Sequence, residues 1–290
     1  MHPAPSLILF TVLSGAGFGL LVWLGLGLRA PTGFAAFILF GLGYGLAGAG
    51  LIAAAFHLGH PERALKAFTQ WRSSWLSREA VLAAATLAVM APHAASSVFA
   101  ATPLPVFGWL GAVLALVTIF ATAMIYAQIK AVPRWHHWST PPVFLFAALA
   151  GGAALAGQAM LALWLMLGLA VAMIVHWMAG DAQFASAGST TGTATGLGKL
   201  GSVRLLEPPH SGQNYLLREM VHVVGRKHAT KLRLIALGAG AVLPALLLLF
   251  PAGYMVIALA LIAHIFGMLA QRWLFFAEAE HVVGLYYGKR

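Results

Sequence analysis

The stretch VFGWLGAVLALVTIFATAMIYAQ, residues 106–128, contains no charged side chain. A helix needs about 20 apolar residues to cross the hydrocarbon core of a bilayer. Irregular backbone cannot face lipid, because its polar groups would stay unpaired. This run is therefore predicted to be a transmembrane helix. Seven further apolar runs, each with at most one charged side chain, predict an all-α polytopic membrane protein with eight transmembrane helices, approximately at 5–28, 34–57, 79–99, 106–128, 140–158, 161–180, 232–250 and 254–276.

The composition agrees with a protein that lies mostly in lipid. Of the 290 residues, 61% are hydrophobic and 8% are charged, whereas a soluble domain is about one quarter charged. We expect residues 1–290 to form a single membrane domain in which 181–231 is a long cytoplasmic loop. Cysteine is absent, which excludes disulfides and thiolate-held iron–sulfur clusters from this chain. If the protein handles electrons, such clusters must lie on a partner.

Positive charge gathers on one side of the predicted bundle. Both termini share that side, which we define as face A, with the loops after the second, fourth and sixth spans. Face A carries sixteen of the 17 Lys and Arg residues, and only Arg29 lies on the opposite side. Because short cytoplasmic loops carry the excess of Lys and Arg, face A and both termini are predicted to be cytoplasmic.

Topology signalling and attraction to anionic lipid would both explain this basic surface. A third explanation is a docking surface for a soluble partner. Its candidate residues are Arg63, Lys66, Arg72, Arg134, Arg226 and Lys227.

The loop after the second span carries the strongest chemical candidate. In AAFHLGHPERALKAFTQWRSSWLSREA, residues 54–80, Gly59 and Pro61 end the helix just after His57. An imidazole is then expected at membrane depth, where ionisable groups are rare and usually functional. Histidine can exchange protons near neutral pH. Quinone chemistry needs such a group, because two protons move with two electrons and a carbonyl oxygen must be held by a hydrogen bond.

Four further residues of this loop complete a candidate site for quinone binding and proton transfer: Trp75, Arg78, Glu79 and Arg63. Tryptophan is typical of the membrane–water boundary. Ser77 and Glu79 also fit an ordinary helix start, with a serine cap and an acid that favours the helix dipole. Both interpretations stay open at this point.

Three histidines lie inside predicted spans, namely His93, His176 and His264. Paired histidines from different helices can ligate haem iron, so a haem b is one alternative and these are its candidate ligands. Each histidine could equally form a hydrogen bond with a backbone carbonyl of a neighbouring helix. Asp181 and Arg272, at the ends of two spans, are interpreted as boundary residues.

The loop motif resembles the membrane-anchor subunit of dimethyl-sulfoxide-reductase-type complexes, the molybdopterin oxidoreductases. The resemblance rests first on His57-Leu58-Gly59 with Pro61 and Arg63-Ala64, and on Trp75-Leu76-Ser77-Arg78-Glu79. It recurs at Val132-Pro133, Trp138, Thr140-Pro141, Arg272, Phe275, Phe276 and His281.

The resemblance implies a complex of three parts: a molybdopterin catalytic subunit, an iron–sulfur subunit with four clusters, and this anchor. The anchor of the family binds a quinone, ubiquinone or menaquinone, beneath the iron–sulfur subunit. The quinol-site histidine of the family maps onto His57, and the acidic residue at the start of its third helix maps onto Glu79.

The orientation departs from the dimethyl-sulfoxide-reducing members, in which the face with this motif is periplasmic. Here that face carries the basic residues, which resembles the branch of cytoplasm-facing sulfite dehydrogenases. We therefore expect an anchor in the bacterial inner membrane that passes electrons between the iron–sulfur subunit and the quinone pool during oxidation of sulfite to sulfate. The alternatives are the anchor of a quinol-oxidising reductase of sulfur or nitrogen oxides, a haem b cytochrome, and a transporter.

Overall fold

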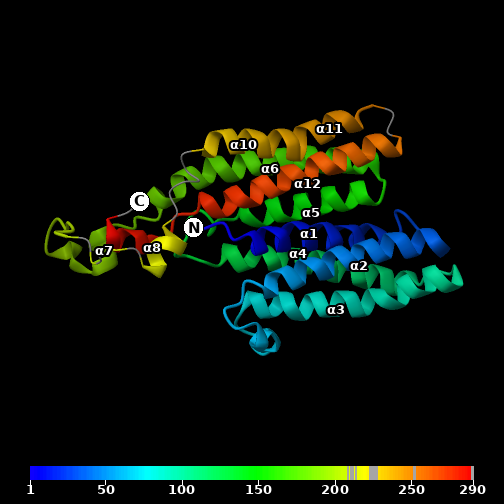
Figure 1. The fold of residues 1–290 in the computed structure, drawn as a ribbon, viewed down its shortest axis with the longest axis horizontal. Helices are drawn as coiled ribbons and strands as arrows, with labels where there is room; N and C mark the ends of the chain where they lie inside the picture. The colour runs from blue at the N-terminus through cyan, green and yellow to red at the C-terminus, as the bar shows by residue number, and fades with distance from the viewer. Residues whose placement is uncertain (208, 210–211, 213, 222–227, 251–252, 289–290) are drawn as a thin grey trace.

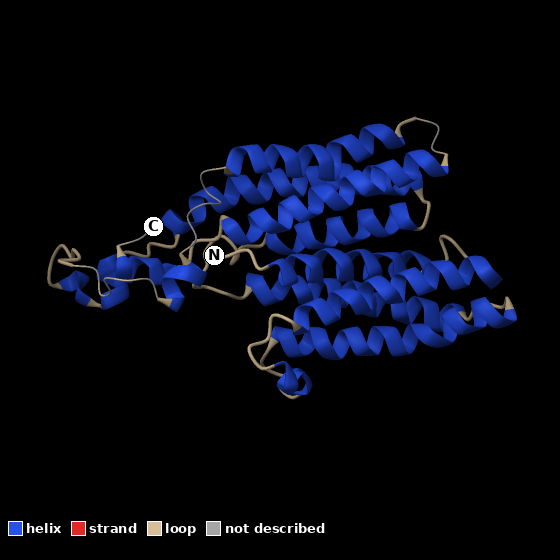
Figure 2. Ribbon diagram, in the orientation of Figure 1, coloured by secondary structure: helices blue, strands red, loops and turns tan. Residues whose placement is uncertain are grey.

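The computed structural model describes residues 1–207, 209, 212, 214–221, 228–250 and 253–288. Within these ranges the chain is helical and forms no strand (Figure 2). The long helices run side by side, and both chain termini lie at the same end of the bundle (Figure 1). The predicted all-helical class is therefore confirmed for the described residues.

The main helices follow one another up and down the bundle: α1 (Pro5–Gly25), α2 (Gly33–Ala55), α3 (Trp75–Ala95), α4 (Pro105–Ala127), α5 (Thr140–Leu155), α6 (Ala159–Ser186), α10 (Ala229–Leu237), α11 (Leu243–Leu248) and α12 (Tyr254–Ala277). Two π-helical segments interrupt this pattern. Segment η2 (Ser96–Ala100) extends α3, and η4 (Gly238–Val242) joins α10 to α11. The loop after α2 contains the 3-10 helix η1 (Pro61–Phe68).

Seven helical segments are long and apolar enough to cross a membrane, whereas α5 falls short of that length. At about 1.5 Å per residue, the 16 residues of α5 reach about 24 Å, against about 30 Å for the hydrocarbon core. The shorter helix is accommodated because α5 lies inside the bundle against α1. A Cβ atom on Gly152 would lie 2.1 Å from the backbone of Gly19, so small residues permit the close approach of the two helices.

Short helices at the end with both termini form a cap outside the bundle: α7 (Thr191–Thr195), η3 (Leu197–Lys199), α8 (Tyr215–Met220) and η5 (Val282–Tyr287). The N-terminal ammonium donates a hydrogen bond to the carbonyl oxygen of Ala279 over 2.6 Å. The Tyr286 hydroxyl donates to the carbonyl oxygen of Ala194, which joins η5 to α7. The N-terminal residue, helix α7 and the described residues that follow α12 therefore meet in one layer.

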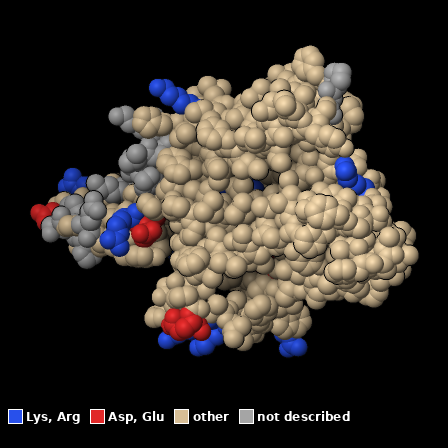
Figure 3. Space-filling model, turned by 45° about the vertical axis from the view of Figure 1, so that its right-hand side comes forward, with Lys and Arg blue, Asp and Glu red and all other residues tan. Residues whose placement is uncertain are grey.

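This layer lies at the end defined above as face A, and it holds most of the charge. Figure 3 shows Lys, Arg, Asp and Glu gathered mainly toward that end, with a largely uncharged surface beyond it. At the opposite end, Arg29 donates a hydrogen bond from Nη1 to the carbonyl oxygen of Ala156. The charge asymmetry seen in the sequence is thus also present in the fold.

Candidate functional site

His57 lies just beyond the C-terminal end of α2, which stops at Ala55. The side chain of His57 is exposed, as is that of Phe56 at 80%. Among the described residues, no hydrogen bond is made by the imidazole of His57. The helix ends two residues earlier than predicted, so His57 lies in the loop, where its exposed ring is open to a ligand.

The start of α3 places three predicted site residues at different depths. Arg78 donates from Nε to the carbonyl oxygen of Trp71 and from Nη2 to that of Arg72, which closes the loop. Its guanidinium lies 4.4 Å from the ring centre of Trp75. Glu79 points inward, is 4% exposed and accepts a hydrogen bond from Thr122 of α4. Trp75 and Arg78 thus form the surface, and Glu79 lies below it.

The interpretation of Ser77 as a helix cap is wrong. Helix α3 begins two residues earlier, at Trp75, with Ser74 at the capping position. Ser77 is consequently inside the helix, where its side chain is buried. Arg63, on η1, is exposed and lies 4.0 Å from a carboxylate oxygen of Glu62. The described contacts do not join Arg63 or His57 to Glu79.

A second buried charge is that of Arg272, which the sequence predicts as a boundary residue. Arg272 is 2% exposed. Its guanidinium lies 3.6 Å from the ring centre of Phe144 and donates from Nη1 to Oε1 of Gln271. No carboxylate of the described residues lies within ion-pair distance of it. The signal in the sequence was the pair Gln271-Arg272 inside the otherwise apolar run of α12.

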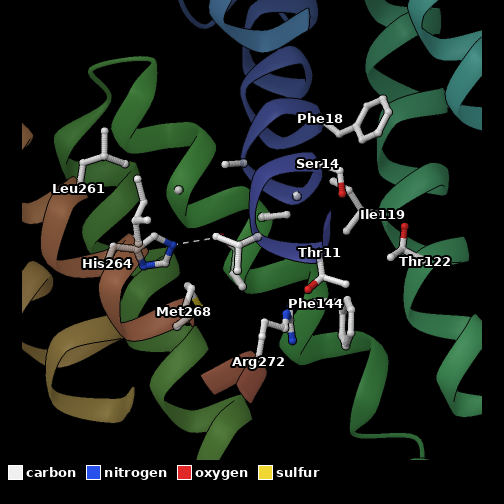
Figure 4. A pocket seen from close by; sticks show the side chains of 17 residues that line it. Thr11, Ser14, Phe18, Ile119, Thr122, Phe144, Leu261, His264, Met268 and Arg272 are labelled. Atoms are coloured by element: carbon white, nitrogen blue, oxygen red, sulfur yellow. Dashed lines mark hydrogen bonds between the residues drawn. The ribbon is translucent and has the colours of Figure 1, made fainter. Parts of the chain in front are cut away.

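A small cavity connects these polar groups. It lies between α1, α4, α5 and α12 and has a volume of about 30 Å³. Figure 4 shows polar side chains around this space, and they include Thr11, Thr122, His264 and Arg272. A cavity needs on the order of 10–15 Å³ to hold one water, so this space fits one or two water molecules and no quinone ring.

The end of the bundle at face A contains a ring of four charged side chains from four segments of the chain. Arg233 of α10 donates to both carboxylate oxygens of Asp181, over 2.6 and 2.8 Å, and from Nε to Glu278 over 2.8 Å. Arg134, in the loop after α4, donates to Asp181 over 2.7 Å and lies 3.8 Å from Glu278. Opposite charges therefore fasten α6, α10, α12 and that loop together at face A.

Each of the candidate haem ligands has a hydrogen-bond partner on a different element. His93 contacts the carbonyl oxygen of Leu104 at 3.0 Å, and His176 contacts the hydroxyl of Ser139 at 2.9 Å. His264 places its two ring nitrogens 2.6 Å from the carbonyl oxygen of Gly240 and 3.3 Å from that of Ala147.

A haem ligand needs a ring nitrogen for iron, and both nitrogens of His264 face carbonyl oxygens. His93 lies in the last turn of α3, at the end of the bundle opposite face A, whereas His176 lies ten residues before the C-terminal end of α6, which is at face A (Figure 1). The described geometry does not bring two of these histidines together around one haem. The haem b alternative stays a prediction, and the positions of these three histidines do not support it.

The predicted docking residues fall into three groups. Arg63, Lys66 and Arg72 are exposed in the loop between α2 and α3. The side chain of Arg134 is only 15% exposed and belongs to the charged ring. Arg226 and Lys227 lie outside the described residues. Among the predicted docking residues that the structure describes, the exposed ones therefore all lie in the loop between α2 and α3.

Comparisons with known proteins place this geometry in a family. The model of the DMSO reductase anchor subunit (DmsC) family matches residues 1–180. A sulfite dehydrogenase subunit of Allochromatium vinosum is 31% identical over 330 aligned residues, which cover 99% of each chain. No solved structure matches significantly. The fold, the motif after α2 and these two matches show that this chain belongs to the DMSO reductase anchor subunit family.

Proposed function

We propose that this chain is the quinone-binding anchor of a three-subunit oxidoreductase that oxidises sulfite to sulfate. An iron–sulfur subunit with four clusters would dock on face A, and a molybdopterin subunit would carry the substrate site. Electrons would pass from the clusters to ubiquinone or menaquinone held by the anchor. Similarity over the full length to a protein named as a subunit of sulfite dehydrogenase supports the choice of sulfite.

The proposal includes eight membrane crossings with both termini in the cytoplasm of a bacterium. Helix α5 is the fifth crossing and brings the seven long segments to eight, and the continuous segment from α10 through η4 to α11 is the seventh crossing along the chain. The position of Arg29 at the otherwise uncharged end supports an outward orientation of that end. Protons for the quinone would then come from the cytoplasm.

The observation that carries the proposed site is a buried carboxyl beneath an exposed histidine loop. Glu79 lies about 6 Å along α3 from its first residue, at about 1.5 Å per residue, and it is held by Thr122. His57 provides a hydrogen-bonding group at the lipid-facing helix end. One group can hold a quinone oxygen while the other supplies a proton, and two protons with two electrons convert the quinone to quinol.

Replacement of His57 by Ala tests this site in the assembled complex. Quinone-dependent sulfite oxidation is expected to fall about 100-fold, which is typical of the loss of a positioned proton-transfer group. Oxidation with an artificial acceptor that reacts at the soluble subunits should not change. His60→Ala is the matched control, because His60 lies in the same exposed loop and, among the described residues, its ring forms a hydrogen bond only with Glu62. Full quinone turnover in His57→Ala would refute the assignment.

A further inference from the structure

A chain of hydrogen bonds leads from the surface of face A into the bundle, away from His57. His137 lies partly exposed in the loop between α4 and α5. Its Nδ1 is 2.8 Å from the hydroxyl oxygen of Ser139, and that oxygen is 2.9 Å from Nδ1 of His176 on α6. Ser139 and His176 are each 2% exposed. Two imidazoles are thus joined by one hydroxyl across the boundary of the bundle.

The neighbouring backbone fixes the hydrogen positions in this chain. The backbone N–H of Ser139 donates to Nδ1 of His137 over 3.3 Å, so that nitrogen carries a lone pair. The hydroxyl of Ser139 must then donate its only hydrogen to the same nitrogen. The remaining contact requires Nδ1–H of His176 to donate to the hydroxyl oxygen. In the neutral rings, Nε2 of His137 carries a hydrogen and Nε2 of His176 carries a lone pair.

The inner end of the chain lies beside the buried polar layer. The ring of His176 stacks on Phe275 at 5.9 Å between centres. The charged and titratable groups that act on it are Arg134, Arg233, Arg272 and His137. Three guanidinium groups would repel a positive charge on His176. His176 is therefore expected to pass a proton on and not to keep it.

Arg272 links this end to the proposed quinone site. It borders the water-sized cavity, as does Thr122, and Thr122 donates to Glu79. Arg272, whose charge acts on His176, and Thr122, which donates to Glu79, therefore border the same cavity inside the bundle.

We propose that His137, Ser139 and His176 form a proton relay between water at face A and this buried polar layer. The inference rests on the proposed function and names a route for its protons. Before an inward transfer, Nδ1 of His137 and Nε2 of His176 carry the ring hydrogens, and Nε2 of His137 and Nδ1 of His176 carry lone pairs. His137 then accepts a proton at Nε2 and gives its Nδ1 proton to Ser139. Ser139 passes its own hydroxyl proton to Nδ1 of His176, and His176 releases its Nε2 proton inward. One proton enters and one leaves, and the hydrogen positions assigned above are those left after this transfer.

The matched variants separate a relay from a merely structural contact. His176→Gln and Ser139→Ala interrupt the transfer, whereas Ser139→Thr keeps the hydroxyl. His136→Gln is the control in the same loop, because Nδ1 of His136 contacts the carbonyl oxygen of Ala127 and takes no part in the chain. His137→Ala removes a partly exposed ring whose place an added imidazole can take.

The experiment measures sulfite oxidation by the whole complex between pH 6 and 8, once with a short-chain quinone and once with an artificial acceptor. The relay predicts that His176→Gln and Ser139→Ala lose about tenfold of quinone turnover at pH 8 and less at pH 6, because proton supply becomes limiting as protons become scarce. Ser139→Thr and His136→Gln should stay near wild type. Imidazole should restore turnover in His137→Ala, and the artificial acceptor should give equal rates throughout.

Quinone turnover in His176→Gln and Ser139→Ala that equals wild type at every pH would overturn the relay. The relay would also be overturned if these variants lost the same fraction of quinone turnover at every pH and imidazole did not restore turnover in His137→Ala. A b-type haem band that disappears in His176→Gln would overturn it as well. If the wild-type complex does not reduce quinone at all, the proposed function itself fails and the relay with it, so the two failures are distinguishable.

Discussion

Two loops of similar composition lie at face A and differ in how their side chains are exposed. The loop 56–74 between α2 and α3 and the loop 128–139 between α4 and α5 both contain histidine, tryptophan, arginine and proline. In the first, His57, Trp71 and Arg72 are exposed. In the second, Trp135 is 3% exposed and donates from its indole nitrogen to the carbonyl oxygen of Phe275 over 2.8 Å.

The difference follows from the position of each loop in the bundle. Helices α2 and α3 lie at one side of it, whereas α5 lies among the other helices (Figure 1). The second loop is also held by the backbone N–H of Val282, which donates to Ala131 over 2.9 Å. The first loop is thus open to a ligand and a partner. The second, although its Trp138 is 68% exposed, is a frame held to the rest of the molecule at Ala131 and Trp135. Composition alone does not separate these roles.

The largest effect is expected below the open loop, at Glu79. Glu79→Gln keeps a hydrogen-bonding side chain beside Thr122 but cannot exchange a proton. Quinone-dependent turnover should fall about 1,000-fold, while turnover with an artificial acceptor stays unchanged. Thr122→Ser, which retains the hydroxyl, is the control and should keep most of the activity. An active Glu79→Gln enzyme would remove the carboxyl from the proposed mechanism.

The ring of four charged side chains that includes Arg134 of the second loop should affect mainly the stability of the protein. Arg233→Ala removes the main partner of Glu278, which is buried, and it is expected to lower the free energy of unfolding by about 3 kcal/mol. Arg63→Ala in the open loop should change it by less than about 0.5 kcal/mol. Thermal unfolding in detergent measures both variants. Equal losses would contradict the distinction between frame and open loop.

The open loop should respond in partner binding. The triple substitution of Arg63, Lys66 and Arg72 by Gln is expected to weaken association with the iron–sulfur subunit about tenfold at low salt, and less as salt screens the charges. Arg29→Gln removes a charge at the other end of the bundle and serves as the control. Binding to detergent-solubilised anchor, measured at several salt concentrations, tests this. Association that is insensitive to the three residues would move the docking surface elsewhere.

The smallest effect is expected where the frame meets the chain termini. Burial, and next the N-terminal ammonium, lower the pKa of His281 below its ordinary value. Its Nδ1 accepts a hydrogen bond from the backbone N–H of Val283 over 3.0 Å. The folded segment favours the neutral ring, so its stability is complete above the ordinary pKa of about 6.5 and falls as pH drops through the lowered pKa.

Hydrogen exchange of residues 282–287 measures this effect. After correction for intrinsic rates, protection should decrease below about pH 6.5. His281→Asn keeps a capping acceptor that does not titrate in this range, so it should lose the pH dependence. A dependence that persists in His281→Asn would assign it to another group.

The sequence predicts the helical class and the gathering of charge at one end, because long apolar runs and basic loops leave few alternatives in lipid. It also predicts a helix end close to His57, although α2 stops two residues earlier, and it places Glu79 near the start of α3. It does not predict the depth of Arg272, because a boundary arginine and a buried one look alike in sequence. The partners of His176 and Arg134 depend on loops that fold back from distant positions, which no local pattern encodes.

The proposed function depends most on the orientation in which the end with the open loop faces the cytoplasm and receives the soluble subunits. The natural chain has no cysteine, so single cysteines can be placed at Leu65, which is 80% exposed, and at Leu28, which is 54% exposed at the other end. A membrane-impermeant thiol reagent should label Leu28→Cys in intact spheroplasts. It should label Leu65→Cys only in opened membranes stripped of the soluble subunits. Labelling of Leu65→Cys from outside, or without protection by those subunits, would contradict the account.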